Sequence, residues 1–322
     1  MGFLDPNASL NRKFGSIGLA LNEIATRVTV RRSHHLEANG PQSERVLKVA
    51  QNFLDALGIR NGVHIEIEQA IPEHVGLGSG TQMALATGFA ISHLFGHDLS
   101  VREVASLTDR GARSGIGIGT FEFGGLIVDG GRARATETPP IICRIKVPDQ
   151  WRFILVFDKQ EQGLNGTREI EAFRHLTSFP ESNAARICHL LLMRGLPALA
   201  EQDIIGFGQS ITEIQHLVGD YFAPAQGGRF MSPKVEAAID WLGAHGAVAL
   251  GQSSWGPTGF CVVEDETRAR GLVDTISRLS AEKKDVRFLI VRAQNEGGDT
   301  RFLDRRQSLP KRTAVGLNHN RS

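Results

Sequence analysis

Two segments in the first quarter of the chain alternate apolar and polar residues. The alternation covers the second half of residues 24–31 and residues 63–67, and both segments contain β-branched side chains, which predicts two half-buried strands. Between them, apolar residues recur at helical spacing up to Leu57. Ser43 is the predicted N-cap of this helix, and Gly58 is its predicted C-terminal stop. The chain therefore begins with a strand, an amphipathic helix and a second strand.

The following stretch is expected to be mainly helical. A glycine-rich loop at 76–80 comes after the second strand, and the mostly apolar residues 81–95 predict a helix directly after it. Ser100-Val-Arg-Glu103 is a capping box that opens another helix. The glycines of residues 115–125 then interrupt the pattern, and their spacing alone predicts a loop.

The second half of the chain has a different order of predicted elements, with short strands and helices. Residues 181–218 are predicted to be mainly helical, with an interruption at Gly195-Leu-Pro197. The other predicted elements are strands at 126–129, 152–157, 247–251, 259–263 and 286–292 and a helix at 266–281. This order is typical of an α+β sandwich of the ferredoxin-like type, and it favours a domain boundary near residue 150.

Composition and charge limit the classes of function. With 322 residues, 41% of them hydrophobic, the chain can bury the cores of about two average domains. Its 36 Lys and Arg against 35 Asp and Glu give a formal charge of +1, so no global field draws it to nucleic acid or to an anionic membrane. Any anion must be bound by local groups. Cys143, Cys188 and Cys261 are far apart and lack the close pairing of a zinc site or a disulfide framework, which favours a reducing compartment.

The expected location is the cytoplasm, and the C-terminal end is expected to be a basic tail. No early stretch combines a basic region with an apolar one, and polar residues interrupt the apolar run at 83–95, so we expect neither secretion nor a membrane span. Residues 301–322 carry six Lys and Arg against one acid and have almost no apolar periodicity, which predicts a disordered basic tail. A nucleic-acid-binding arm is the alternative, but the basic residues are not interleaved with aromatic ones.

The strongest local signal for chemistry is the segment Ile71–Gln82, between a predicted strand and a predicted helix. Its glycines allow successive amide N–H groups to converge, and the helix N-terminus adds partial positive charge. The segment has no lysine, unlike the P-loop of nucleotide-binding proteins. A glycine-rich connection that merely turns the chain is the alternative. The predicted phosphate-binding residues are Gly76, Leu77, Gly78, Ser79, Gly80 and Thr81.

A second candidate site lies in the N-terminal loop, where one carboxylate is followed by two adjacent cations. Arg12 can bind a phosphate through its planar guanidinium and Lys13 can act as a point charge. Asp5 can bind Mg²⁺ or stabilise positive charge. Composition alone favours a solvated loop.

Two further stretches combine glycines with polar side chains. Arg113 and Ser114 can contact an anion or a polar ligand, and Trp255 can stack on an aromatic substrate, although packing in the core is equally consistent with a tryptophan. Hydroxyl groups beside Trp255 can orient a carboxylate or a phosphate. The predicted substrate-binding residues are Arg113, Ser114, Ser253, Ser254, Trp255 and Thr258.

These motifs resemble those of a known superfamily. Residues 72–80 resemble the P-x-x-x-G-L-G-S-S phosphate loop of the GHMP kinases, except that Gly80 stands where most of those kinases have serine. That serine helps to handle nucleotide phosphate and metal, so the departure argues against the use of ATP. The opening segment, residues 2–20, closely resembles the β-ribofuranosylaminobenzene 5′-phosphate synthases, a GHMP branch that binds phosphoribosyl pyrophosphate instead of ATP. The resemblance extends to about Arg292 and includes residues 113–125, 226–229 and 252–259.

The resemblance implies a fold, an activity and a set of partners. The expected fold is α+β and GHMP-kinase-like, with a ribosomal-protein-S5-like α/β domain over residues 1–150 and a ferredoxin-like domain over 151–300. The implied reaction condenses 4-aminobenzoate with phosphoribosyl pyrophosphate and releases CO₂ and pyrophosphate, an early step towards methanopterin cofactors. Mg²⁺ is the implied cofactor, a homodimer is the expected assembly, and Asp5, Arg12 and Lys13 are the expected catalytic residues, with Asp5 also as a metal ligand.

Two other functions remain open at this point. An ATP-dependent GHMP kinase acting on a small alcohol would use the same fold and loop. A non-catalytic sensor built on this fold would bind a phosphorylated metabolite without turnover.

Overall fold

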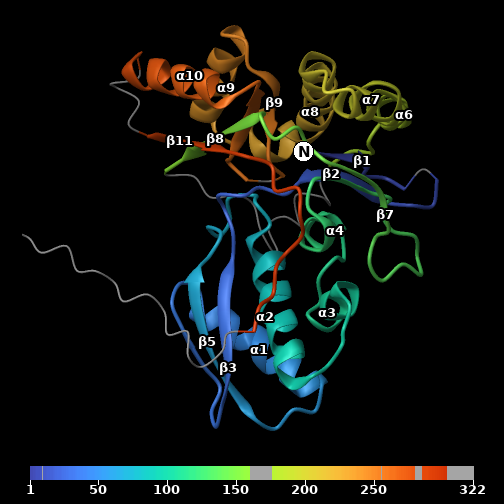
Figure 1. The fold of residues 1–322 in the computed structure, drawn as a ribbon. Helices are drawn as coiled ribbons and strands as arrows, with labels where there is room; N and C mark the ends of the chain where they lie inside the picture. Colours follow the sequence, from blue (N-terminus) through green and yellow to red (C-terminus); the bar gives the residue numbers. More distant parts are fainter. Residues whose placement is uncertain (9, 160–175, 255, 280–284, 303–322) are drawn as a thin grey trace, which may run out of the picture.

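The structure is a computed structural model that describes residues 1–8, 10–159, 176–254, 256–279 and 285–302 (Figure 1). Trp255 and nearly all of the predicted basic tail lie outside these residues. Three sheets organise the described chain. In Figure 1 the last sheet and its helices form the upper half, and the helices and strands of residues 27–107 form the lower half.

The first sheet is antiparallel and has the order β1-β2-β6-β7. The N-terminal segment predicted as a loop forms a hairpin instead, because the apolar residues after its polar turn pair back along the first strand and bury Ile17. The strand at 126–129 is confirmed, and the last strand of the sheet was not predicted. The strands are β1 (Gly2–Asp5), β2 (Phe14–Leu19), β6 (Leu126–Asp129) and β7 (Ile141–Ile145).

The second sheet, of order β3-β5-β4, confirms the two strands predicted from alternation. Its strands are β3 (Arg27–Ser33), β5 (Gly62–Gln69) and β4 (Glu37–Asn39). Helices α1 (Ser43–Ala56) and α2 (Ser79–Phe95) bury their apolar faces in one core with β5. Gly58 ends α1 with a φ of 65° as predicted, but the predicted N-cap is wrong, because Gln42 and not Ser43 occupies that position.

Two short helices follow α2. The predicted capping box is confirmed in α3 (Val101–Leu107), where Ser100 and Glu103 bond reciprocally. The prediction of a loop at 115–125 is wrong for most of its length, because α4 covers Ile116–Phe123. Side chains at Gly117 and Gly119 would collide with Thr81 and Ile127, so these glycines allow α4 to pack closely on α2 and β6.

The third sheet is antiparallel, in the order β11-β8-β10-β9. Side chains of its second strand alternate between two cores: Phe153 and Leu155 face the helices α6 to α8, and Ile154 faces α9 and α10. The four predicted strands and the helix at 266–281 are confirmed within a few residues, and α9 was not predicted. The elements are β8 (Arg152–Asp158), α9 (Pro233–Ala244), β9 (Val248–Gln252), β10 (Gly259–Val263), α10 (Glu266–Leu279) and β11 (Val286–Val291).

The long helical segment breaks later than predicted. At Gly195-Leu-Pro197 the chain stays helical through a π-helical turn at Leu191–Gly195, and the break falls at residues 201–203. There Asp203 caps the next helix by accepting hydrogen bonds from two of its amides. The helices are α6 (Glu181–Leu190), α7 (Leu196–Ala200) and α8 (Ile204–Gln226).

One core joins the first and third sheets. Ile17 and Val128 of the first sheet pack in the same cluster as Leu155 of the third and Ile211 of α8. The predicted boundary near residue 150 falls between β7 and β8 and stays a prediction. Within the described residues, no helix combines the length and the apolar composition that a bilayer crossing requires.

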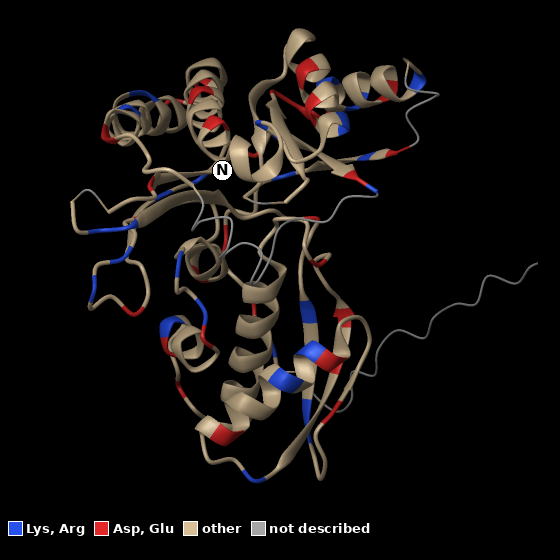
Figure 2. Ribbon diagram, turned by 180° about the vertical axis from the view of Figure 1, so that it is seen from behind, with Lys and Arg blue, Asp and Glu red and all other residues tan. Residues whose placement is uncertain are grey.

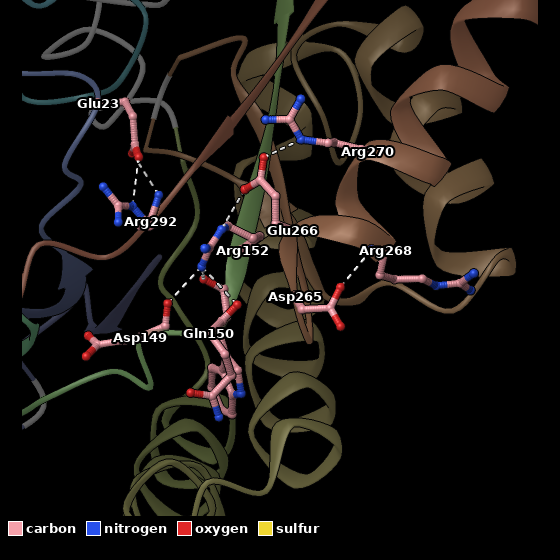
Figure 3. Close-up of polar contacts among 10 residues, drawn as sticks. Glu23, Asp149, Gln150, Arg152, Asp265, Glu266, Arg268, Arg270 and Arg292 are labelled. Carbon is pink, nitrogen blue, oxygen red and sulfur yellow. Dashed lines mark hydrogen bonds and ion pairs between the residues drawn. The ribbon is translucent and has the colours of Figure 1, made fainter.

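Charged residues of both signs are interspersed over both halves (Figure 2). Some of them connect distant parts of the chain (Figure 3). Arg152 on β8 donates to Glu266 on α10 at 2.7 Å, and Arg292 after β11 donates to Glu23 before β3 at 3.1 Å. The first pair links β8 to α10, and the second links the segment after the last strand to the N-terminal half.

Candidate active site

A cavity of about 1250 Å³ lies where the two halves meet. Its walls come from β2, β3, α2 between Thr81 and Leu94, α4, α8 and the segment after β9. This volume exceeds the ~300–1,000 Å³ of an ordinary small-molecule pocket, so it has room for two substrates. Seven of the predicted site residues line it: Gly76, Leu77, Gly78, Thr81, Ser114, Ser253 and Ser254.

The glycine-rich loop leads directly into α2 at the wall of this cavity. Gly76 and Gly78 have φ angles of 79° and 72°, in the left-handed region that glycine adopts without steric cost. The backbone N–H groups of residues 77–80 have no hydrogen-bond partner within the described chain. Because four unpaired donors meet at the N-terminus of a 17-residue helix, the loop is suited to bind an anion.

The segment after β9 holds the loop in this shape. The Ser253 hydroxyl donates to the carbonyl of Gly76 and the Thr258 hydroxyl to the carbonyl of Val75, both at 2.7 Å. A side chain at Gly76 would overlap the carbonyl oxygen of Ser253. Both hydroxyl groups were predicted to bind substrate, and in the structure both position the loop.

Ser114 reaches the cavity from the turn before α4. Its hydroxyl donates to Asp129 at 3.1 Å, and the same carboxylate accepts from the amides of Gly115 and Gly131 at 2.8 Å. Asp129 is fully buried, and burial raises the pKa of its carboxyl group although the three hydrogen bonds oppose the shift. This carboxylate therefore fixes the start of α4 and the turn after β6.

The predicted catalytic residues lie at the other end of the β1–β2 hairpin. Gly2 and Ile17 pair beside the cavity, whereas Asp5 pairs with Phe14, three residues further along β1. None of Asp5, Arg12 and Lys13 lines the cavity, and in Figure 1 the hairpin loop points away from the start of α2. Their catalytic roles stay predictions.

The hairpin cations have partners in the fold. Arg12 donates to the carbonyls of Gly130 and Gly131 at 3.1 and 2.8 Å, and the Lys13 ammonium lies 5.1 Å from the centre of the Phe14 ring. One carboxylate oxygen of Asp5 accepts from the Asn7 amide.

The remaining predicted residues do not meet at the cavity wall. Arg113 and Thr258 do not line it, and neither do Ser79 and Gly80 in the first turn of α2. Trp255 lies outside the described residues. The described chain contains no group of three or more His, Cys, Asp or Glu side chains suited to a metal ion, and the Mg²⁺ prediction stays open.

Sequence reasoning missed two arginines near the loop. The guanidinium groups of Arg45 and Arg110 lie beside Gly80, where most GHMP kinases have serine. The only sequence signal for them is that departure from the motif.

Comparison with known proteins supplies independent information. The GHMP kinases N terminal domain matches residues 44–125, and the GHMP kinases C terminal domain matches residues 196–280. Two similar relatives are both called β-ribofuranosylphenol 5′-phosphate synthase. The protein of Methanothermobacter thermautotrophicus is 31% identical over 82% of this chain and 85% of its own length. That of Archaeoglobus fulgidus is 33% identical over 91% of this chain and 94% of its own length.

Solved structures confirm the predicted fold. The homoserine kinase of Cytophaga hutchinsonii superposes with a TM-score of 0.65 at 18% identity, covering 87% of this chain and 90% of its own. The mevalonate kinase of Methanococcus jannaschii also gives 0.65, at 17% identity, covering 91% and 96%. At such identities the likeness establishes an α+β GHMP-kinase fold and carries no information about substrates.

Proposed function

Because this chain belongs to the β-ribofuranosylphenol 5′-phosphate synthase family, within the GHMP kinase superfamily, we propose that it condenses 4-aminobenzoate with phosphoribosyl pyrophosphate. The products are β-ribofuranosylaminobenzene 5′-phosphate, CO₂ and pyrophosphate. The observation that carries the proposal is the loop of residues 76–80, which has four amides without a partner in the described chain and whose residues 76–78 line a cavity large enough for both substrates.

In the reaction two single bonds break and one new carbon–carbon bond forms. The bond between ribose C1 and the pyrophosphate oxygen breaks, and pyrophosphate leaves with the electron pair. The ring carbon that bears the carboxylate attacks C1, and the ring regains aromaticity when its bond to the carboxylate breaks and CO₂ departs. No proton is gained or lost, so a general base is not required. The main task of the protein is to stabilise the charge that develops on the leaving group.

Each part of the site has a use in this scheme. The amides of residues 77–80 and the positive end of α2 bind pyrophosphate, with the Thr81 hydroxyl beside them on the cavity wall. The apolar side of the cavity, which includes Phe3, Phe222 and Phe260, accepts the aromatic ring. Mg²⁺ would enter bound to the phosphates of the substrate, as is common for this ion.

The aromatic acceptor has two candidates. 4-Aminobenzoate gives an aminobenzene product, whereas the names of the two relatives contain a phenol, which corresponds to 4-hydroxybenzoate. The two acceptors differ only in the group opposite the carboxylate, and both donate electrons to the attacking carbon. Direct competition between them for the protein decides which is the substrate.

The test is to incubate the full chain with Mg²⁺, phosphoribosyl pyrophosphate and either acceptor labelled at the carboxyl carbon. We expect CO₂ and pyrophosphate in equal amounts, and neither product when one substrate is omitted. A parallel incubation with ATP and small alcohols tests for kinase activity. Phosphorylation of an alcohol without CO₂ release would replace the synthase by a kinase, and tight binding of phosphoribosyl pyrophosphate without any product would indicate a sensor.

A further inference from the structure

Two arginines from different helical segments meet at the first turn of α2. Arg45 lies in the first turn of α1, whose start is fixed beside the loop because Gln42 donates from its side chain to the carbonyl of Ile71 at 2.9 Å. Arg110 follows α3, where its amide donates to the carbonyl of Ala105 at 2.8 Å. Since α1 and α3 both pack on α2, two guanidinium groups reach Gly80.

Gly80 leaves room for these groups. A β-carbon on Gly80 would overlap Nη2 of Arg45 and lie 3.6 Å from Nη1 of Arg110. Any larger residue at this position therefore moves the Arg45 guanidinium. The serine of the kinase motif and the observed position of Arg45 exclude each other.

The positive charge of the two arginines is only partly balanced by nearby acidic side chains. Arg45 forms one ion pair, with Glu73 at 2.7 Å, while 30% of its side chain stays exposed. Arg110 has no ion pair within the described chain, and its Nε is buried without a hydrogen-bond partner. Burial lowers the pKa of Arg110, the charge of Arg45 lowers it further, and Asp109 only partly opposes the shift. A buried donor without a partner costs stability, so an anion that accepts from it is favoured.

We infer that Arg45 and Arg110 are binding residues for the pyrophosphate group of the substrate, and that Gly80 is small so that Arg45 can reach it. The identity of the anion rests on the proposed function. Neither arginine lines the cavity itself, so the phosphates extend from the cavity to the first turn of α2, where the unpaired amides of residues 77–80 and the two guanidinium groups beside Gly80 hold them. The arginines then supply fixed positive charge as pyrophosphate leaves C1.

The test is calorimetric titration of the full chain with inorganic pyrophosphate and, separately, with ribose 5-phosphate. We expect Arg45→Gln and Arg110→Gln each to weaken pyrophosphate binding by about tenfold to a hundredfold, which is the usual effect of losing a hydrogen bond to a charged group. Binding of ribose 5-phosphate should change little. Gly80→Ala should weaken pyrophosphate binding as well, and the chain should still fold because only the end of a flexible side chain has to move.

Arg186→Gln is the matched control. Arg186 forms an ion pair with Glu213 at 2.7 Å, the same length as that of Arg45, on α6 and α8 far from the loop. Loss of this pair should leave pyrophosphate binding unchanged. Thermal unfolding of each variant shows whether the fold is intact.

The outcomes separate this inference from the proposed function. Unchanged pyrophosphate binding in Arg45→Gln and Arg110→Gln, with synthase turnover present in the unaltered chain, overturns the inference alone. Loss of ribose 5-phosphate binding without loss of pyrophosphate binding also overturns it, since the arginines would then hold the other end of the substrate. Weakened pyrophosphate binding supports the inference even if the unaltered chain releases no CO₂.

Discussion

The loop at residues 76–80 and the tip of the β1–β2 hairpin both carry a sequence pattern for phosphate binding. They differ in how many hydrogen-bond donors the fold leaves without a partner. At the loop, the backbone amides of residues 77–80 have no hydrogen-bond partner within the described chain, and Leu77 and Gly78 line the cavity. At the hairpin, Arg12 already donates to two carbonyls of the turn after β6. The number of cations in a segment is therefore a weaker guide to anion binding than the number of donors left without a partner.

The largest effect should come from the loop. Gly76→Val places a side chain against the Ser253 carbonyl at a φ of 79°, so the loop cannot keep its shape. We expect turnover to fall by about a hundredfold or more, measured as initial rate of CO₂ release. Gly78→Val is the matched control, because its φ is 72° but nothing lies within 4 Å of an added β-carbon. Equal losses in both variants would show that strain alone, and not contact with the C-terminal half, governs the loop.

The next effect concerns the hydroxyl groups that hold the loop. Thr258→Val keeps the shape of a fully buried side chain but leaves the Val75 carbonyl without its donor. We expect the free energy of unfolding to fall by about 1–3 kcal/mol, and pyrophosphate affinity to fall with it. Urea titration and calorimetry measure the two quantities. If the free energy of unfolding fell while pyrophosphate affinity did not, the Thr258 hydroxyl would stabilise the fold without positioning the loop for the anion.

A smaller effect is expected at the hairpin. Arg12→Gln removes exposed hydrogen bonds to the carbonyls of Gly130 and Gly131, so stability should fall by only about 1 kcal/mol. Pyrophosphate affinity should change by no more than about twofold, or less than about 0.5 kcal/mol, because Arg12 does not line the cavity. A tenfold loss would restore the hairpin as an anion site and would support the predicted catalytic roles of Asp5, Arg12 and Lys13.

The smallest effect should be a dependence of stability on pH. The pKa of Asp129 is raised by burial, so the folded chain holds this proton at pH values where the unfolded chain has released it. Its contribution is therefore greatest below the ordinary value of 3.8 and declines as the pH rises through the raised pKa. Asp129→Asn should remove this decline, and urea midpoints of both proteins over the acidic range measure it. If the urea midpoints of the variant depended on pH in the same way as those of the unaltered chain, groups other than Asp129 would cause the decline in stability.

Much of the architecture was predictable because it rests on local pattern. Period-2 alternation located β3 and β5, and the Ser100–Glu103 capping box located α3. Helix α4 could not be found in this way, since its glycines are poor helix formers. They are tolerated because side chains at Gly117 and Gly119 would collide with Thr81 and Ile127, contacts that only the tertiary structure creates.

The candidate site was predictable in part for the same reason. The phosphate loop is continuous in sequence, so its glycines and its position before a helix could be recognised together. Arg45 and Arg110 are separated by two helices, and nothing in their spacing indicates that they meet at Gly80. The partners of Arg12 belong to a turn more than 100 residues away, so its hydrogen bonds to backbone carbonyls could not be foreseen.

The hydroxyl contacts of Ser253 and Thr258 also make the two halves of the chain thermodynamically dependent on each other. The loop belongs to the N-terminal half, yet the groups that hold its carbonyls come from the segment between β9 and β10. If that segment separates from the sheet, the loop loses these two hydrogen bonds. A loop that is held in its ordered shape in turn favours the conformation in which the two hydrogen bonds are formed. We therefore expect pyrophosphate bound at the loop to slow hydrogen exchange in β10, because local opening on one side requires loss of the ligand on the other.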